Sequence, residues 1–270
     1  MPTWAGVGAS AALVVLAMAV VVRARLGLSR ELIFAAVRAA VQLAAVGALL
    51  VVLFEHAGLA GGLGWVAAMV VIAGYVAGRR GAGLPRARLA ATIGISVGTV
   101  ATLGVLLAVD VIATQAFVVV PVGGMVVSGA MQAAALTLRR LRESARTARP
   151  AIEARLCLGL PGAVAFDPYF TEALRTALIP SVDATKVVGL ISLPGAMTGL
   201  ILAGVSPLTA IRYQIVVMFM LLAAHTVAAL VTGRLAGRWL FDDAHRLRPV
   251  DRERAVDGEH GGRARRSSRR

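Results

Sequence analysis

Cysteine and lysine each occur only once in this chain of 270 residues, as Cys157 and Lys186. A single cysteine excludes an intramolecular disulfide and a Cys-x-x-Cys metal or redox pair, and we expect Cys157 to be a small apolar filler. The sequence contains no G-x-x-x-x-G-K-[ST] phosphate loop, no H-E-x-x-H and no G-x-S-x-G motif. These absences predict that the chain is not an enzyme, hydrolyses no ATP by itself and needs no cofactor.

Charged and aromatic residues are also scarce, at 16% and 5% of the chain. Soluble domains carry about 25% charged residues, whereas here 58% of the residues are hydrophobic and the mean hydropathy is +0.80. The composition predicts an all-α polytopic membrane protein. The net charge of +14 comes from arginines between apolar runs and in the tail, with few aromatic rings to stack on bases, so no nucleic-acid partner is expected.

Seven apolar runs are long enough to be membrane-spanning helices, since a bilayer core of about 30 Å needs about 20 apolar residues. The third is short and the fifth is long, so both have soft boundaries. The predicted spans are Trp4–Val22, Glu31–Phe54, Leu63–Gly78, Leu89–Val109, Ile112–Leu138, Lys186–Ala203 and Tyr213–Leu235.

The arginines alternate between the connections that join these runs. They follow the first, third, fifth and seventh runs and are missing from the second and fourth connections, with Arg212 as the exception before the last run. Cytoplasmic connections retain Arg and Lys, so we expect the N-terminus outside and the C-terminus in the cytoplasm, in a multi-pass protein of the inner (plasma) membrane. The first run has no basic segment before it and is therefore not read as a cleaved signal peptide.

The predicted organisation is a transmembrane domain over residues 1–240 followed by a basic cytoplasmic tail over 241–270. The tail mixes charge with Gly and Ser, which predicts disorder or attraction to anionic lipid head groups. A long cytoplasmic loop over residues 139–183 carries two helical patches, Ala151–Leu158 closed by Gly159, and Pro168–Ile179 stopped by Pro180. A structured loop of this kind suggests a docking point for another protein.

Polar residues occur inside the predicted spans, where they persist mainly when they face protein or water. Arg38 and Gln42 stand four residues apart in the second run, and Ser128 and Gln132 do so in the fifth. His225 lies inside the seventh. Each is either part of a transport pathway or an inter-helical hydrogen-bonding group. Arg38 is also close enough to the cytoplasmic end of its run for its side chain to reach the membrane–water interface.

The sixth run contains the stretch SLPGAMTG, residues 192–199, with the helix-weakening pair Pro194 and Gly195. We expect a kinked helix here whose freed carbonyls line a cavity or a buried interface. Gly195 and Gly199 also form a small-xxx-small face that suits close helix packing. A packing kink without a transport role is the alternative.

The sequence IEARLCLG in the long loop resembles the EAA motif of ABC-transporter permeases, which forms the helix that inserts into the ATPase subunit. Glu153, Ala154 and Gly159 match that motif, while Arg155 replaces its second small residue. The resemblance implies that these residues couple the chain to an ATPase.

A longer stretch resembles the closing half of the FetB-like permease family, which is associated with bacterial iron export and plant aluminium tolerance. The matching segments are Arg175-Thr176 with Pro180, Val188–Leu190, Leu193–Gly199, Gly204, Pro207, Arg212–Gln214, RAAVQL at 38–43 and GGMVVSGAM at 123–131. The resemblance covers about 220 residues, with departures at Asp183–Lys186 and in the arginine-rich tail.

The resemblance implies a permease subunit of an ABC transporter that pairs with itself, binds a separate cytoplasmic ATPase and exports iron or another metal ion. Met125, Met131, Met197 and Met218 supply thioethers that suit copper(I), or adaptable packing, and no metal site is assigned. The alternatives are an ABC permease for a nucleotide sugar, a stand-alone secondary transporter or channel, and a membrane scaffold.

Overall fold

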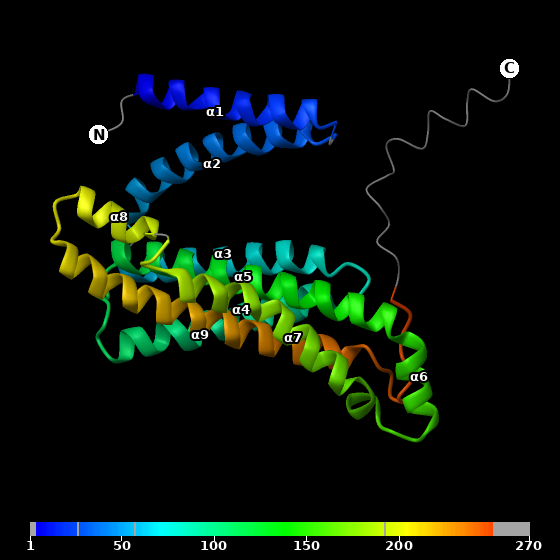
Figure 1. Ribbon diagram of the computed structural model, residues 1–270. Helices are drawn as coiled ribbons and strands as arrows, with labels where there is room; N and C mark the ends of the chain where they lie inside the picture. The colour runs from blue at the N-terminus through cyan, green and yellow to red at the C-terminus, as the bar shows by residue number, and fades with distance from the viewer. Residues whose placement is uncertain (1–3, 26, 57, 192, 251–270) are drawn as a thin grey trace, which may run out of the picture. The chain divides into compact units, whose positions relative to one another are not determined.

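The computed structural model describes residues 4–25, 27–56, 58–191 and 193–250. In these residues the chain forms helices joined by turns, with an isolated antiparallel bridge between Phe241 and Leu247 (Figure 1). The helices are α1 (Trp4–Arg23), α2 (Ser29–His56), α3 (Gly58–Arg80), α4 (Ala87–Ala108), α5 (Ala116–Thr147), α6 (Arg149–Cys157), α7 (Gly162–Val187), α8 (Gly195–Leu202) and α9 (Pro207–Trp239).

The chain divides into two compact units, residues 1–61 and residues 62–270. In the first unit, α1 and α2 pack against each other as a helical hairpin. The turn between them includes Arg25 and Gly27, which both have positive φ angles of 52° and 70°. Such left-handed positions are typical of chain reversals after a helix.

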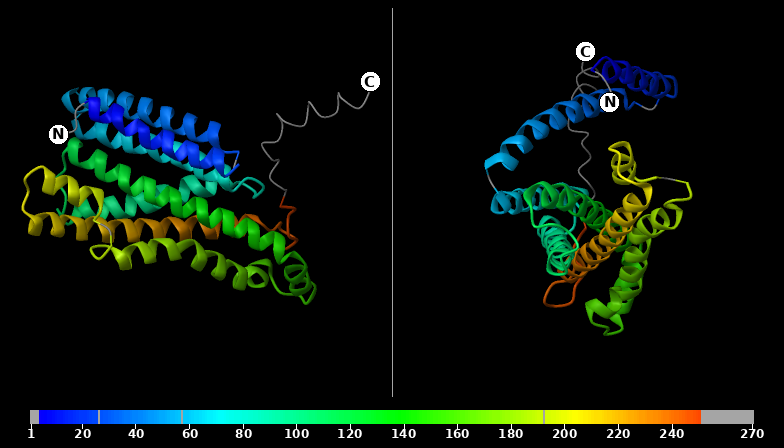
Figure 2. Two further views of the ribbon diagram at one scale, coloured as in Figure 1. Left: turned by 45° about the horizontal axis from the view of Figure 1, so that its top comes forward. Right: turned by 90° about the vertical axis from the view of Figure 1, so that its left-hand side faces the viewer.

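The second unit is a helical bundle with α5 and α9 at its centre (Figure 2). Helix α4 packs against both of them, and α7 packs against them from another side. Helix α3 touches α4 and α5 at Gly74, Gly78 and Gly123. The short helices lie at opposite ends, with α6 beside the start of α7 and α8 beside the start of α9 (Figure 1).

Small residues allow the central helices to approach closely. Gly94 and Gly98 of α4 face Ala224, Ala228 and Thr232 of α9, and a Cβ atom added at Gly98 would lie 3.1 Å from the Ala224 carbonyl oxygen. Helices in membranes pack through such small-xxx-small faces because the hydrophobic effect gives them little help. The glycines therefore set the distance between α4 and α9.

The all-α polytopic class is confirmed by this architecture. Five of the described helices are long and apolar enough to cross a membrane: α2 over residues 29–51, α3, α4, α5 and α9. Within α1, the stretch Ala11–Arg23 is a shorter apolar helix.

The predicted sixth span, Lys186–Ala203, is wrong as a single kinked helix. Helix α7 ends at Val187, Gly189 has a positive φ of 82°, and Pro194 precedes the eight-residue α8. The break is therefore a complete helix end, because a left-handed residue and a proline together prevent the helix from continuing.

The predicted cytoplasmic loop over residues 139–183 is also corrected. Helix α5 continues to Thr147, and α7 continues through Pro180 instead of stopping there. Its buried residues Ala165, Phe166, Ala173 and Ala177 form one stripe, which α7 packs against α5 and α9. This packing compensates for the missing backbone donor at Pro180. Helix α6 and the short segments beside it connect α5 to α7.

Residues 241–250, which the domain expectation placed in the tail, fold back onto the bundle. Phe241 and Leu247 form the isolated bridge, and Leu240 and Leu247 are buried. These apolar residues anchor a segment that hydropathy alone assigned to the tail. The rest of the predicted tail, residues 251–270, lies outside the described residues.

The basic connections of the larger unit gather at one end. The α3–α4 connection, α6 and the end of α9 lie together, while the α4–α5 connection and α8 lie at the opposite end (Figure 1). Because α7 runs between these two ends, residues 157 and 190 are separated by the length of the bundle. The predicted orientation then places residue 157 in the cytoplasm and residue 190 outside.

This arrangement can be tested with the single cysteine. Cys157 is exposed, and Leu190 is 86% exposed just after α7. In intact cells a membrane-impermeant thiol reagent should label a Cys157→Ser/Leu190→Cys variant but should label the wild-type protein only after permeabilisation. Equal labelling of both proteins in intact cells would contradict the expectation that α7 crosses the membrane.

Candidate functional site

An inter-helical hydrogen bond inside the bundle joins α7 to α9. The Nδ1 atom of His225 lies 2.7 Å from the Ser181 Oγ atom. Ser181 directly follows Pro180, which has no backbone N–H group to donate. The bond therefore fixes α7 where its own backbone hydrogen bonding is interrupted. Both residues are partly buried. The bond connects the half of α7 that is remote from α6 to the centre of the bundle.

The opposite edge of the His225 ring, which carries Nε2 and Cδ2, lies against Gly129 of α5. A Cβ atom at Gly129 would overlap the His225 Nε2 atom and lie 2.8 Å from Cδ2. The Nε2 atom is buried and has no hydrogen-bond partner among the described residues. Three helices thus meet at one imidazole, whose second nitrogen remains able to donate or accept a hydrogen bond.

The predicted pair Ser128 and Gln132 lies next to this point but on another face of α5. Gln132 Nε2 donates to Ser128 Oγ at 3.5 Å, and both side chains are exposed. Gly129, between them in sequence, is buried. The structure therefore brings His225 to the α5 backbone without bringing it to this pair. Arg38 and Gln42 lie on α2 of the first unit, and their roles stay predictions.

A further set of polar side chains was missed by the sequence analysis. Each is buried in the bundle and carries an oxygen without a hydrogen-bond partner among the described residues. The set consists of Thr99 and Thr102 of α4, Thr137 of α5, and Gln214 and Thr232 of α9. Buried polar atoms are almost always paired, so these oxygens are available for a hydrogen bond with water, a ligand or the backbone. Thr99, Thr102 and Thr232 each adjoin a glycine or an alanine, which was the available sequence signal. Thr137 and Gln214 adjoin larger residues and carry no such signal.

The residues of the SLPGAMTG stretch lie at the opposite end of the bundle from α6. Ser192 lies outside the described residues. Pro194 is the N-cap residue of α8, and Gly195 is its first residue. A Cβ atom at Gly195 or Gly199 would meet no atom within 4 Å. These glycines are thus not used for close packing within the described chain, and their role in a pathway or an interface stays a prediction.

The predicted coupling residues lie on α6 and directly after it. Glu153 accepts a hydrogen bond from Arg149 Nε at 2.8 Å, Ala154 is exposed, and Gly159 has a φ of 83° that ends the helix region. Buried Ile152 holds α6 in place. In contrast, Leu158 is 82% exposed. Cys157 is also exposed, so its expected role as a packing filler is wrong.

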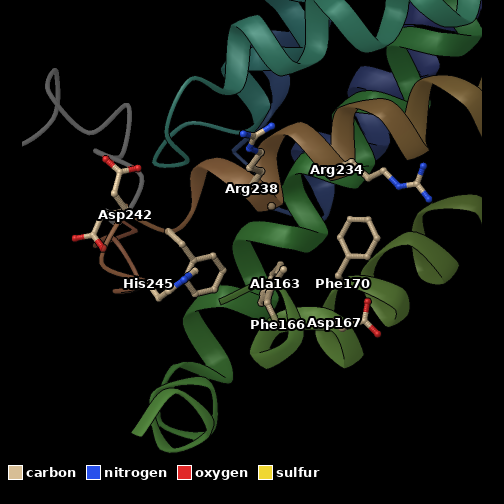
Figure 3. Close-up of a pocket in the computed structure, with 11 residues that line it drawn as sticks. Ala163, Phe166, Asp167, Phe170, Arg234, Arg238, Asp242 and His245 are labelled. Carbon is tan, nitrogen blue, oxygen red and sulfur yellow. The ribbon is translucent and has the colours of Figure 1, made fainter. Parts of the chain in front are cut away.

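A cavity of about 670 Å³ lies at the same end, between α7, α9 and the residues after α9 (Figure 3). Helix α7 contributes Phe166, Asp167 and Phe170, and α9 contributes Arg234 and Arg238. The segment after α9 contributes further aromatic and charged side chains. Aromatic rings and charged groups of both signs therefore line the cavity.

The turn beside this cavity is held by Asp242. Its carboxylate accepts hydrogen bonds from the backbone N–H groups of Arg246 at 2.8 Å and Ala244 at 3.1 Å, and from Arg246 Nε at 2.9 Å. These bonds, led by the one from the Arg246 backbone, lower the pKa of Asp242. His245 Nδ1 accepts from the Gly162 N–H at 3.4 Å and ties the turn to the start of α7.

The described residues contain no group of three or more His, Cys, Asp or Glu side chains arranged to hold a metal ion. Of the methionines considered from sequence, Met125 and Met131 pack against the hydrophobic core. Met197 and Met218 lie on α8 and α9. The structure assigns no metal ligand among them.

The sequence matches one protein family over almost all of the described helices. The family described as "Uncharacterised protein family (UPF0014)" matches residues 4–241. The rice protein "UPF0014 membrane protein STAR2" is 39% identical over 239 residues, covering 88% of this chain and 84% of its own length. No solved structure matches the chain.

Two further relatives carry functional names. "Protein ALUMINUM SENSITIVE 3" of Arabidopsis thaliana is 36% identical over 244 residues, covering 88% of each chain. "Probable iron export permease protein FetB" of Escherichia coli is 34% identical over 235 residues, covering 87% of this chain and 91% of its own length. The predicted resemblance to FetB-like permeases is confirmed.

The contact between α5 and His225 can be tested with two glycine substitutions on the same helix. Gly129→Ala must displace the imidazole and with it the bond to Ser181, whereas a Cβ atom at Gly124 lies 3.7 Å from the nearest atom, the Met69 sulfur. Overpacking costs about 1–3 kcal/mol. We therefore expect Gly129→Ala to unfold at lower denaturant concentration than Gly124→Ala in the same detergent. Equal midpoints for the two variants would contradict this contact.

Proposed function

This chain belongs to the UPF0014 family, and we propose that it is the membrane permease subunit of an ABC transporter that exports iron or another metal ion. The named relative from Escherichia coli is described as an iron export permease, and the chain spans 91% of that protein's length. The five apolar helices of spanning length agree with such a role in a multi-pass inner-membrane protein.

The single observation that carries the proposal is the position of α7. Its first residues follow α6 at the basic end, and its Ser181 contacts His225 inside the bundle. A displacement of α6 by a bound ATPase would therefore move one rigid helix whose other half borders the polar interior. A permease that receives energy from a separate subunit needs such a mechanical connection.

The proposed ATPase-binding surface consists of Glu153, Ala154, Leu158 and Gly159. The Leu158 side chain is 82% exposed, so it is free to contact a partner that binds α6. Glu153 is already paired with Arg149, so it shapes α6 and also presents a carboxylate to a partner. The helix itself is anchored by Ile152, so it can transmit a force.

For the transported ion, we propose a route along the buried polar side chains of α4, α5 and α9 together with His225. The imidazole Nε2 atom and the threonine oxygens are ligands or hydrogen-bonding groups that a hydrated or partly hydrated metal ion can use. The chain is proposed to act as a homodimer, with Arg38, Gln42, Gly195 and Gly199 contributing to the pathway or to the interface between the two copies.

The coupling role of α6 predicts a specific effect of Leu158→Asp. The side chain makes little contact with its own chain, so the variant should insert and remain stable. A carboxylate on an apolar docking surface should, however, reduce copurification of the coexpressed ATPase by at least about tenfold, since burying an unpaired charge costs several kcal/mol. Leu158→Met is the matched control and should behave as the wild type.

Metal efflux from cells is the second measurement on these variants. Efflux normalised to folded protein should fall with ATPase association in Leu158→Asp and stay unchanged in Leu158→Met. Wild-type ATPase association in Leu158→Asp would show that the partner binds elsewhere. Wild-type efflux without a bound ATPase would contradict the ABC-transporter function as a whole.

A further inference from the structure

Four arginines occupy ten residues at the junction of α3 and α4, namely Arg79, Arg80, Arg86 and Arg88. Two glycines bring the helices together here. A Cβ atom at Gly74 would overlap Thr92, and one at Gly78 would overlap Arg88. The backbone of Arg88 therefore packs directly against α3, which places its side chain beside the last turn of that helix.

Two of these guanidinium groups share one aromatic ring. The Cζ atom of Arg88 lies 4.8 Å from the centroid of the Tyr75 ring, and that of Arg79 lies 6.0 Å from the same centroid. A third guanidinium, that of Arg86, lies 5.6 Å from the centroid of the Trp239 ring. Cation–π contacts orient the arginines without neutralising their charge.

No carboxylate balances this cluster in the described part of the chain. The side chains of Arg79 and Arg88 form no hydrogen bond or ion pair there, whereas Arg140, Arg149 and Arg246 at the same end pair with Glu143, Glu153 and Asp242. Holding two like charges beside one ring is unfavourable unless an anion lies between or near them. Both residues are exposed, so an anion from outside the chain can reach the two guanidinium groups.

The cluster directly follows the apolar part of α3, where the hydrocarbon core would end if α3 spans a membrane. Helix α3 is one of the apolar helices of spanning length, and Val71 and Ile72, one turn before Tyr75, are exposed. Tyrosine and tryptophan are enriched where the hydrocarbon core ends, and the cytoplasmic leaflet is rich in anionic lipids. A guanidinium pair matches the two free oxygens of a phosphodiester.

We propose that Arg79 and Arg88, held by Tyr75, form a binding site for the phosphate of an anionic phospholipid. Arg86 on Trp239 supplies a third positive charge beside it. The site would fix the α3–α4 end of the bundle to the cytoplasmic leaflet, next to the end of α9. It does not depend on the proposed transport function, since it uses neither α6 nor the polar interior.

The test uses the full chain in detergent and measures binding of phosphatidylglycerol by native mass spectrometry, with phosphatidylcholine as the neutral comparison. The Arg79→Gln/Arg88→Gln variant removes two charges and keeps the side-chain stems. Arg139→Gln/Arg146→Gln is the matched control, because it removes two exposed arginines of α5 near the same end. We expect about tenfold weaker phosphatidylglycerol binding in the first variant and little change in the second.

A second pair of variants separates the site from general attraction. Tyr75→Leu removes the ring but keeps both charges and should weaken binding several-fold, while Tyr75→Phe should bind as the wild type. Equal losses in both arginine pairs, or no preference of the wild type for phosphatidylglycerol over phosphatidylcholine, would overturn the proposal. Loss of ATPase copurification with unchanged lipid binding in Arg79→Gln/Arg88→Gln would assign the cluster to a protein partner and would also overturn it.

Discussion

The close approach of α4, α5 and α9 is the constraint on which the other features of the larger unit depend. It requires glycine at positions 94, 98 and 129, because a methyl group at any of them would contact the facing helix. Close packing leaves little room for side chains between the helices. The polar groups inside, including Thr232 and the imidazole of His225, are therefore held against backbone atoms of a neighbouring helix. Their positions are set by the spacing of the helices.

The coupling role that we propose for helix α7 depends on the close packing of α4, α5 and α9. It carries an apolar stripe toward α5 and α9, two internal prolines and five charged residues, a combination that is too polar for an ordinary lipid-facing span. Its bond from Ser181 to His225 fixes one half to the rigid centre, and its other half leads to α6. A helix held at one end and free to be pushed at the other can transfer a displacement across the bundle. This transfer of a displacement along α7 is the coupling that we propose.

Much of this organisation could be predicted from the amino-acid sequence, and the failures have physical causes. Hydropathy found the helices whose buried and lipid-facing sides are both apolar, and the pattern in IEARLCLG located α6. Hydropathy failed for α7, because its buried side is a stripe and its other residues are charged; Ser181 was missed for the same reason. The separation of Ser128 from His225 depends on helix rotation, which a four-residue spacing does not specify. The anchoring of residues 241–250 rests on two leucines in a charged context.

The most direct test of the central claim is the number of metal ions transported per ATP hydrolysed in inverted membrane vesicles that contain the chain and the ATPase proposed to bind it. Ser181→Ala removes the oxygen that bonds to His225 and leaves α6 and its surface intact. The account predicts that the ATPase stays bound and hydrolyses ATP while iron accumulation per ATP falls severalfold. An unchanged ratio in a stably inserted Ser181→Ala variant would contradict the role of α7 as the connection between ATPase and pathway.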